Sequence, residues 1–151
     1  MKYLSLAALT LIAFFLEGRI SLLGISPDLT ALLAFGVGIR YGETRGLLAG
    51  VVIGAIEDSI SGSIIGPNLL GKGIVGFSSS LFVSGRLLRW TPLLGMIVVS
   101  LLTFVDGFVV FLARSVFDTV PALPSTAFFV AIMQSLLNAP AGIFVRPKNA
   151  D

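Results

Sequence analysis

Two acids at the end of an apolar run, and a lysine in the next run, are the first residues in this sequence that could do chemistry. Glu57 and Asp58 end the run that follows Arg45, and Lys72 lies beyond a turn rich in serine, glycine and proline. Two clustered carboxylates can in principle hold a cation. Neighbouring residues of a helix, however, point about 100° apart and rarely chelate one ion together. Metal binding is therefore not the expected use of this pair.

A charge pair across the turn is the expected arrangement. An unpaired charge in an apolar interior is costly, so we expect Lys72 to pair with Glu57 or Asp58. Asn68 lies four residues before Lys72 and shares its helix face. These four residues are predicted to form a polar element that shapes the tip of a helical hairpin. The alternative is that one acid, or Lys72, faces a cavity or a partner protein.

Known catalytic arrangements do not fit the chain. It has no histidine and no cysteine, so the serine run at 78–80 lacks the imidazole base that a serine nucleophile needs. Asp106-Gly107 with Ala113-Arg114 faintly resembles the signature of CDP-alcohol phosphotransferases, but the spacing differs and the downstream metal-binding aspartates are missing. The Gly-x-Gly-Asp tetrapeptide of intramembrane aspartyl proteases does not occur. The sequence predicts a protein that is not an enzyme and that uses no cofactor or metal.

The composition indicates a polytopic membrane protein. Of the 151 residues, 56% are hydrophobic and 12% charged, and the mean hydropathy is +1.02, whereas a soluble domain carries about 25% charged residues. A soluble fold would need nearly every helix buried on all sides, and so short a chain has too little interior for that. The lipid bilayer is the expected solvent. The few basic residues suit membrane topology better than contact with nucleic acid.

Six apolar blocks predict a bundle of six transmembrane helices, all α, in a single domain over residues 1–151. The blocks are Tyr3–Leu16, Ile25–Tyr41, Leu47–Ile56, Leu69–Leu88, Thr91–Leu112 and Ala122–Val145. No small-residue cleavage site follows the first block, so we expect it to be retained as a span. The second block starts at Ser26-Pro27-Asp28, which suits a helix start with proline in its first turn and an acid near its positive end. The second and third blocks are shorter than the about 20 residues of a full span, so their polar ends must be covered by neighbouring helices or dip into the membrane.

The distribution of charge predicts that both termini are cytoplasmic. With six spans, that side holds seven of the ten basic residues, namely Lys2, Arg40, Arg45, Arg86, Arg89, Arg146 and Lys148, in line with the positive-inside rule. Six acids fall toward the opposite side, namely Glu17, Asp28, Glu57, Asp58, Asp106 and Asp118. We therefore expect an outer polar layer that includes Asp28 and Asp106. Asp106 has no evident partner in its own segment and must reach another helix, a water pocket or the surface.

A stripe of small residues precedes the two acids. Gly46, Gly50 and Gly54 recur every fourth residue, so on a helix they form a smooth face that a second helix can approach closely. The expected use of the stripe is packing within the protein. The alternative is that it forms a docking face for the membrane helix of a partner.

Together these features resemble the MreD family of rod shape-determining proteins. The resemblance is carried by Pro27-Asp28-Leu29, by the glycine series that runs into Glu57-Asp58 and Ser61-Gly62, and by Gly66-x-Asn68 with Lys72. It implies a non-enzymatic scaffold in the bacterial inner (plasma) membrane. Such a subunit would bind the membrane-anchored protein MreC and, through it, the MreB cytoskeleton, the glycosyltransferase RodA and its partner transpeptidase. Its role would be to help organise peptidoglycan synthesis and cell shape.

The same resemblance implies an alternative function. MreD is similar in fold to the S components of energy-coupling-factor transporters, six-helix bundles that bind vitamins in an outward-facing pocket. The predicted outer polar layer would suit such a pocket. Against this alternative, the first block lacks the Ala-x-x-x-Ala surface that S components often present to their energising partner. Tyr41 and Trp90, at the inner joints, are typical of membrane anchors and not of ligand platforms.

Overall fold

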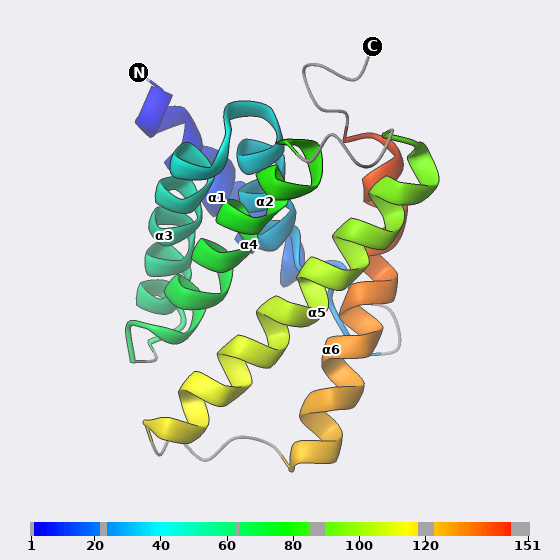
Figure 1. Cartoon of the computed structure of the whole chain (residues 1–151). Coiled ribbons are helices and arrows are strands. Elements are labelled where there is room, and N and C mark those ends of the chain that lie inside the picture. The colour runs from blue at the N-terminus through cyan, green and yellow to red at the C-terminus, as the bar shows by residue number, and fades with distance from the viewer. Residues whose placement is uncertain (1, 22–23, 63, 85–89, 118–122, 146–151) are drawn as a thin grey trace.

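The apolar runs fold into antiparallel helices. The computed structural model describes residues 2–21, 24–62, 64–84, 90–117 and 123–145. Within these ranges the chain forms six α-helices and one short 3₁₀ helix, namely α1 (Lys2–Glu17), α2 (Leu29–Tyr41), α3 (Glu43–Ile60), α4 (Pro67–Ser84), α5 (Pro92–Val116), α6 (Pro124–Asn138) and η1 (Ala139–Ile143). Successive helices run in opposite directions (Figure 1). As a result, α1 begins and η1 ends at the same end of the bundle.

The helix α2 begins one residue after a capping aspartate. The side chain of Asp28 accepts a hydrogen bond from the main-chain N–H of Ala31, 2.7 Å away, as an N-cap residue should. The helix proper starts at Leu29. Pro27 therefore lies before the cap, and the prediction that it belongs to the first helical turn is wrong.

The joint between α2 and α3 is a single residue, and α3 is longer than its apolar block. Gly42 has a φ of +91° and ends one helix while it begins the next, a conformation that glycine adopts at little cost. The helix α3 spans 18 residues. It continues through Arg45 at its start and through Glu57 and Asp58 at its end, so the polar residues that flank the apolar block are themselves helical.

Two helices of the described part are long and apolar enough to cross a membrane. These are α5, with 25 residues and a mean hydropathy of 2.4, and α6 continued through η1, with 20 residues and a mean hydropathy of 1.4. Only 33% and 22% of their apolar windows are buried inside the protein, unlike the core helices of a soluble domain. Their large outward-facing side chains, such as Leu93, Ile97 and Phe129, are suited to lipid.

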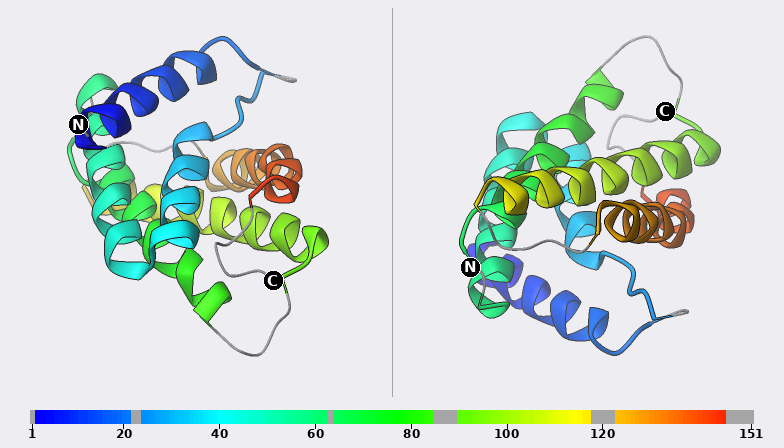
Figure 2. Two further views of the ribbon diagram at one scale, coloured as in Figure 1. Left: turned by 90° about the horizontal axis from the view of Figure 1, so that it is seen from above. Right: turned by 90° about the horizontal axis from the view of Figure 1, so that it is seen from below.

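The core lies between α2, α3, α4 and α5. The most extensive contact joins α3 to α4, and α2 packs against both of them. Seen along the bundle, α1 lies to one side of α2 and α6 lies beside α5 (Figure 2). The buried apolar side chains that form one cluster are Ala34, Phe35, Ile39, Ile53, Val75, Val98, Val99 and Leu102.

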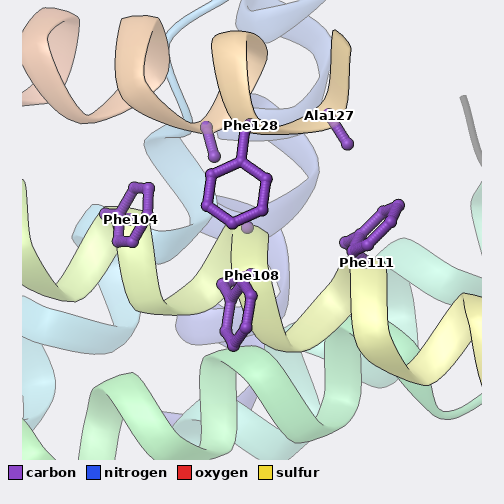
Figure 3. Close-up of a pocket in the computed structure, with 7 residues that line it drawn as sticks. Phe104, Phe108, Phe111, Ala127 and Phe128 are labelled. Atoms are coloured by element: carbon purple, nitrogen blue, oxygen red, sulfur yellow. The ribbon is translucent and has the colours of Figure 1, made fainter. Parts of the chain in front are cut away.

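Aromatic side chains fill the contact between α5 and α6. The rings of Phe104 and Phe108 lie 6.1 and 5.8 Å, between centroids, from the ring of Phe128, within the range of favourable aromatic pairs. Gly107 allows α6 to approach at Ala131. A small recess between these helices is lined by apolar residues only (Figure 3), so it offers no polar group to orient a ligand.

Candidate functional site

The predicted glycine stripe lies at the interface of α3 and α4. All three glycines are buried, and each lies against a main-chain carbonyl of α4: Gly46 against Gly76, Gly50 against Lys72, and Gly54 against Asn68. A Cβ atom at any of the three would overlap that carbonyl. The α4 residues also recur every fourth position, so the two antiparallel helices touch along their backbones. Close Cα–H to carbonyl contacts of this kind are weakly favourable. The stripe therefore faces another helix of the same chain.

A third helix meets the hairpin where glycines of all three helices come together. A Cβ atom at Gly38 of α2 would overlap both the Gly76 carbonyl and the Ser79 hydroxyl, and one at Gly46 would approach the Cα atom of Gly38. Ser79 Oγ donates to the Gly76 carbonyl at 2.9 Å. The roles of Gly38 and Gly76 were not predicted from the sequence. The four-residue spacing of Asn68, Lys72 and Gly76, which matches the α3 stripe, is the signal that could have identified Gly76.

Asp58 holds the beginning of α4. Its side chain is fully buried, and its carboxylate accepts hydrogen bonds from the main-chain N–H groups of Gly66, Asn68 and Leu69 at 2.8, 3.2 and 3.2 Å. The Asn68 side-chain amide donates a fourth bond at 2.8 Å. Because the first N–H groups of a helix lack partners within the helix and form its positive end, a carboxylate there is strongly stabilised. Asp58 thus links the end of α3 to the start of α4.

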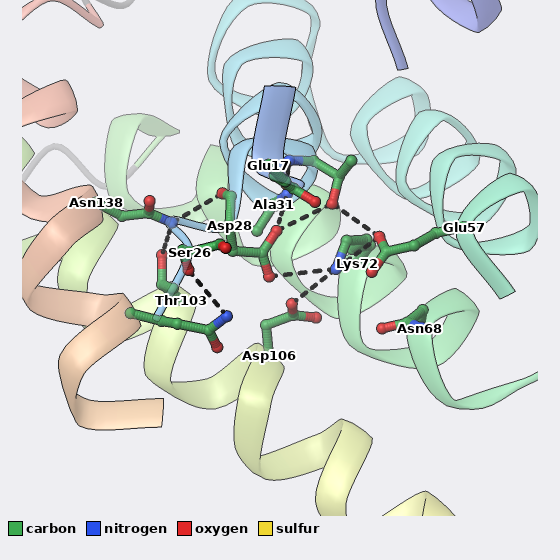
Figure 4. Close-up of polar contacts among 12 residues, drawn as sticks. Glu17, Ser26, Asp28, Ala31, Glu57, Asn68, Lys72, Thr103, Asp106 and Asn138 are labelled. Carbon is green, nitrogen blue, oxygen red and sulfur yellow. Dashed lines mark hydrogen bonds and ion pairs between the residues drawn. The ribbon is translucent and has the colours of Figure 1, made fainter. Parts of the chain in front are cut away.

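Lys72 instead joins three other acids (Figure 4). Its Nζ atom lies 3.0 Å from Asp106, 3.1 Å from Glu57 and 3.3 Å from Asp28. The side chains of Lys72 and Asp106 are only 1% exposed. The sequence left open whether Lys72 pairs with Glu57 or with Asp58, and the structure has the pair with Glu57. Asp58 is already satisfied by the N–H groups of α4.

Thr30 connects further groups to this cluster. Its main-chain N–H donates to Glu17 at 2.8 Å, and its hydroxyl lies 2.7 Å from a Glu57 oxygen and 3.0 Å from an Asp28 oxygen. We call Glu17, Asp28, Glu57, Lys72 and Asp106, together with Thr30, the Lys72 cluster. The helix α1, the cap of α2, and the helices α3, α4 and α5 each contribute one of its ionisable groups.

Two side-chain amides of α6 form hydrogen bonds near the Lys72 cluster. Asn138 Nδ2 donates to the main-chain carbonyl of Asp28 at 2.8 Å and to Thr103 Oγ at 3.1 Å. Gln134 Nε2 donates to the carbonyl of Ser26 at 3.2 Å. These bonds fix the segment before α2 against α6. Sequence reasoning missed Asn138 and Gln134, because their acceptors are mostly backbone atoms that carry no side-chain pattern.

The geometry favours a structural lock over metal chemistry or catalysis. The Lys72 ammonium has three N–H donors and lies within ion-pair distance of three carboxyl groups, so each donor has an acceptor. Among the described residues, no group of three or more acids is arranged to hold a metal ion. Of the acids predicted to form an outer polar layer, the structure brings Glu17, Asp28, Glu57 and Asp106 together. Asp58 lies nearby, at the tip of the α3–α4 hairpin. Outside the described residues lie Arg86, Arg89, Asp118, Arg146 and Lys148, which entered the prediction of orientation.

Comparison with known proteins gives a family match that covers almost the whole chain. No curated protein and no solved structure matches. A family model described as rod shape-determining protein MreD matches residues 1–146 of the 151. That range includes the Lys72 cluster, the glycine interface and all described helices. This chain therefore belongs to the MreD family of rod shape-determining proteins, which are non-enzymatic membrane proteins.

Proposed function

We propose that this protein is a scaffold subunit of the bacterial cell-elongation complex that binds MreC. The family match over residues 1–146 carries the proposal. Membership implies a role in rod-shape determination and a place in the cytoplasmic membrane. Binding of MreC, and through it the association with MreB, RodA and the partner transpeptidase in organising peptidoglycan synthesis, is the finer part of the proposal.

The structure supports a rigid platform as the mechanism of such a scaffold. Backbone contact between α3 and α4, together with the buried bonds of Asp58 and Lys72, fixes the relative positions of the helices from inside. Large apolar side chains remain on the outside of α5 and α6. In a bilayer, such a surface packs against lipid or against the membrane helix of a partner. A rigid bundle presents this surface in a fixed shape, so it can position a partner without any chemical step.

Purification of the protein with its neighbours tests the proposed function. The tagged chain is expressed at native level, extracted in mild detergent and captured, and the bound proteins and small molecules are identified by mass spectrometry. We expect MreC to be enriched over a control capture with an unrelated polytopic membrane protein of similar size. A version of MreC with its anchoring helix replaced by an unrelated one should lose this enrichment. Failure of MreC to enrich under conditions in which the bundle stays folded would contradict the proposal.

A six-span topology with both termini in the cytoplasm is part of the same proposal. The six described helices alternate in direction (Figure 1). The 18 residues of α3 and of α4 correspond to about 27 Å each, close to the apolar thickness of a bilayer. In this topology the joint at Gly42 is cytoplasmic and the hairpin tip near Ser61 is outside. The whole chain then forms one membrane domain.

Cysteine labelling gives a direct test of this topology, because the chain has no cysteine of its own. Ser61 and Thr44 are both exposed and lie at opposite ends of α3. In intact spheroplasts, a membrane-impermeant maleimide should label a Ser61→Cys variant and leave a Thr44→Cys variant unlabelled until the membrane is permeabilised. The reverse pattern would place the hairpin tip in the cytoplasm and overturn the proposed orientation.

The alternative function, a vitamin-binding S component, is distinguished by the same capture. Enrichment of an ATPase module, or of a bound vitamin, would favour it. The charged groups that suggested an outward ligand site from the sequence are bonded to one another in the Lys72 cluster. The small recess between α5 and α6 beside Phe108 is apolar, and a larger, open recess between the same helices has only Ser100 and Ser135 as polar lining residues. These observations favour the scaffold.

A further inference from the structure

A single hydroxyl group in the Lys72 cluster lies between two carboxyl groups. Thr30 Oγ is 2.7 Å from Glu57 Oε2 and 3.0 Å from Asp28 Oδ1, both within hydrogen-bonding distance. Thr30 is completely buried. A threonine hydroxyl carries one hydrogen and can donate one full hydrogen bond, while its lone pairs can accept others. Two ionised carboxylates cannot donate, so two full bonds at Thr30 require that one of the two carboxyl groups carries a proton.

The balance of charge points the same way. The ionisable groups that face this site are Glu17 from α1, Asp28 from the cap of α2, Glu57 from α3, Lys72 from α4 and Asp106 from α5. The groups that reach it from α6 are the uncharged amides Gln134 and Asn138. Four acids therefore surround one base. In an apolar interior, the excess negative charge is much more costly than a neutral carboxylic acid.

The contacts also indicate which acid holds the proton. Asp28 is well placed to be an anion, because it caps α2, accepts the Ala31 N–H at 2.7 Å and lies at the positive end of that helix. Glu57 lies in the last turns of α3, near the negative end of its own helix. We propose that the Lys72 cluster is a proton-binding site in which Glu57 is the neutral acid. Glu57 Oε2–H donates to Thr30 Oγ, and Thr30 Oγ–H donates to Asp28 Oδ1.

This assignment makes the proton a structural component of the helix junction. The Lys72 ammonium still lies between Asp28, Glu57 and Asp106, because a protonated carboxyl oxygen can accept a bond. Loss of the proton would place two anionic oxygens on either side of Thr30 and weaken the contact between α2 and α3. The folded protein then holds a proton that an exposed glutamate in the unfolded chain has released. The contribution of this proton to stability should accordingly begin to fall where an exposed glutamate ionises, at about pH 4, and be lost once Glu57 itself releases the proton.

Infrared spectroscopy of the purified protein at neutral pH tests the assignment directly. We expect the wild type to show a carbonyl band of a protonated carboxylic acid that shifts in D₂O. The band should be lost in Glu57→Gln and retained in Glu43→Gln, the matched control, because Glu43 is exposed at the start of α3. Absence of the band in the wild type, as expected for a hydroxyl shared between two carboxylates, would overturn the proposal. So would its retention in Glu57→Gln.

Thermal unfolding provides a second readout that does not depend on the band. A glutamine at position 57 mimics the neutral acid, since its amide can donate to Thr30 Oγ. We therefore expect Glu57→Gln to unfold near the wild-type temperature at neutral pH and to lose less stability at alkaline pH. Asp106→Asn, which removes an anion from Lys72, should unfold several degrees lower. If Glu57→Gln were destabilised as much as Asp106→Asn, Glu57 would be an ionised partner of Lys72 and the proposal would be wrong.

Discussion

Replacing Lys72 with methionine is expected to remove most of the stability of this protein in detergent. The substitution leaves Asp28, Glu57 and Asp106 facing one another without their shared cation. Removing one member of a buried ion pair costs about 3 to 5 kcal/mol, and Lys72 serves three acids at once. Since folded proteins are stable by only about 5 to 15 kcal/mol, we expect a low yield of folded protein and a large drop in the unfolding temperature.

Two companion variants make the Lys72 prediction specific. Arg45→Met removes an exposed cation from α3 and should leave the unfolding temperature nearly unchanged, because exposed charges contribute little. Adding Asp106→Asn to Lys72→Met removes one of the carboxylates that has lost its cation. The double variant should therefore unfold at a higher temperature than Lys72→Met alone. Unfolding of Lys72→Met at the wild-type temperature would show that the cluster is not a structural element.

Replacing Gly50 with alanine is expected to have the second-largest effect. The new Cβ atom would overlap the Lys72 carbonyl, and neither backbone can move without displacing the other contacts along the hairpin. Inserting atoms into a packed interior typically costs 1 to 3 kcal/mol and sometimes more. We expect a loss of about 3 kcal/mol or more, because the overlap is with main chain and not with an adjustable side chain. Gly50→Leu should disrupt the hairpin entirely and reduce the yield of the partner complex.

Gly36 provides the matched control for the glycine prediction. It lies in α2, and a Cβ atom there would meet no other atom within 4 Å. Gly36→Ala should therefore keep the fold and gain up to about 1 kcal/mol from the better helix propensity of alanine. Thermal unfolding of the two purified variants compares them directly. Equal stability of Gly50→Ala and Gly36→Ala would mean that α3 and α4 do not touch at their backbones.

The helices could be predicted from the sequence, and their ends only in part. All six apolar blocks correspond to described helices, because long apolar runs separated by proline, glycine and polar residues leave few other folds. The ends differ where polar residues continue a helix, as at Glu57 and Asp58 of α3. Such residues bond to groups on other helices, and a hydropathy pattern does not contain that information.

The faces of α3 explain why Lys72 pairs with Glu57 and not with Asp58. The step of four from Gly50 through Gly54 reaches Asp58, so Asp58 shares the face that touches α4 and meets the first N–H groups of that helix. Glu57 lies four residues after Ile53, which is buried in the core cluster, and therefore points inward. The glycine spacing already contained this distinction. What the sequence did not give was the register of α4, which decides whether Lys72 or Asn68 lies opposite Asp58.

The contacts of Thr30 and Asn138 could not be found from the sequence alone. Thr30, its partner Glu17, and Asn138 come from distant parts of the chain and lie close together only because α1, α2 and α6 pack around one point. The residues around Thr30 in the sequence form no recognisable motif. Its hydrogen bond to Glu17 comes from the main chain, and any residue other than proline could donate it. Clusters of this kind depend on tertiary packing, which local periodicity does not encode.

The order of the cluster along the chain bears on how the protein is made. Glu17, Asp28, Glu57 and Lys72 all belong to the first four helices, whereas Asp106 comes from α5. Proteins are synthesised from the N-terminus, and early segments begin to associate before later ones emerge. The nascent chain therefore acquires Lys72 together with two of its three carboxyl partners, Asp28 and Glu57, and the third, Asp106, is added only when α5 has been made. The first four helices alone therefore hold Lys72 without its most buried partner, and the ion pair with Asp106 forms only after α5 has packed against α4.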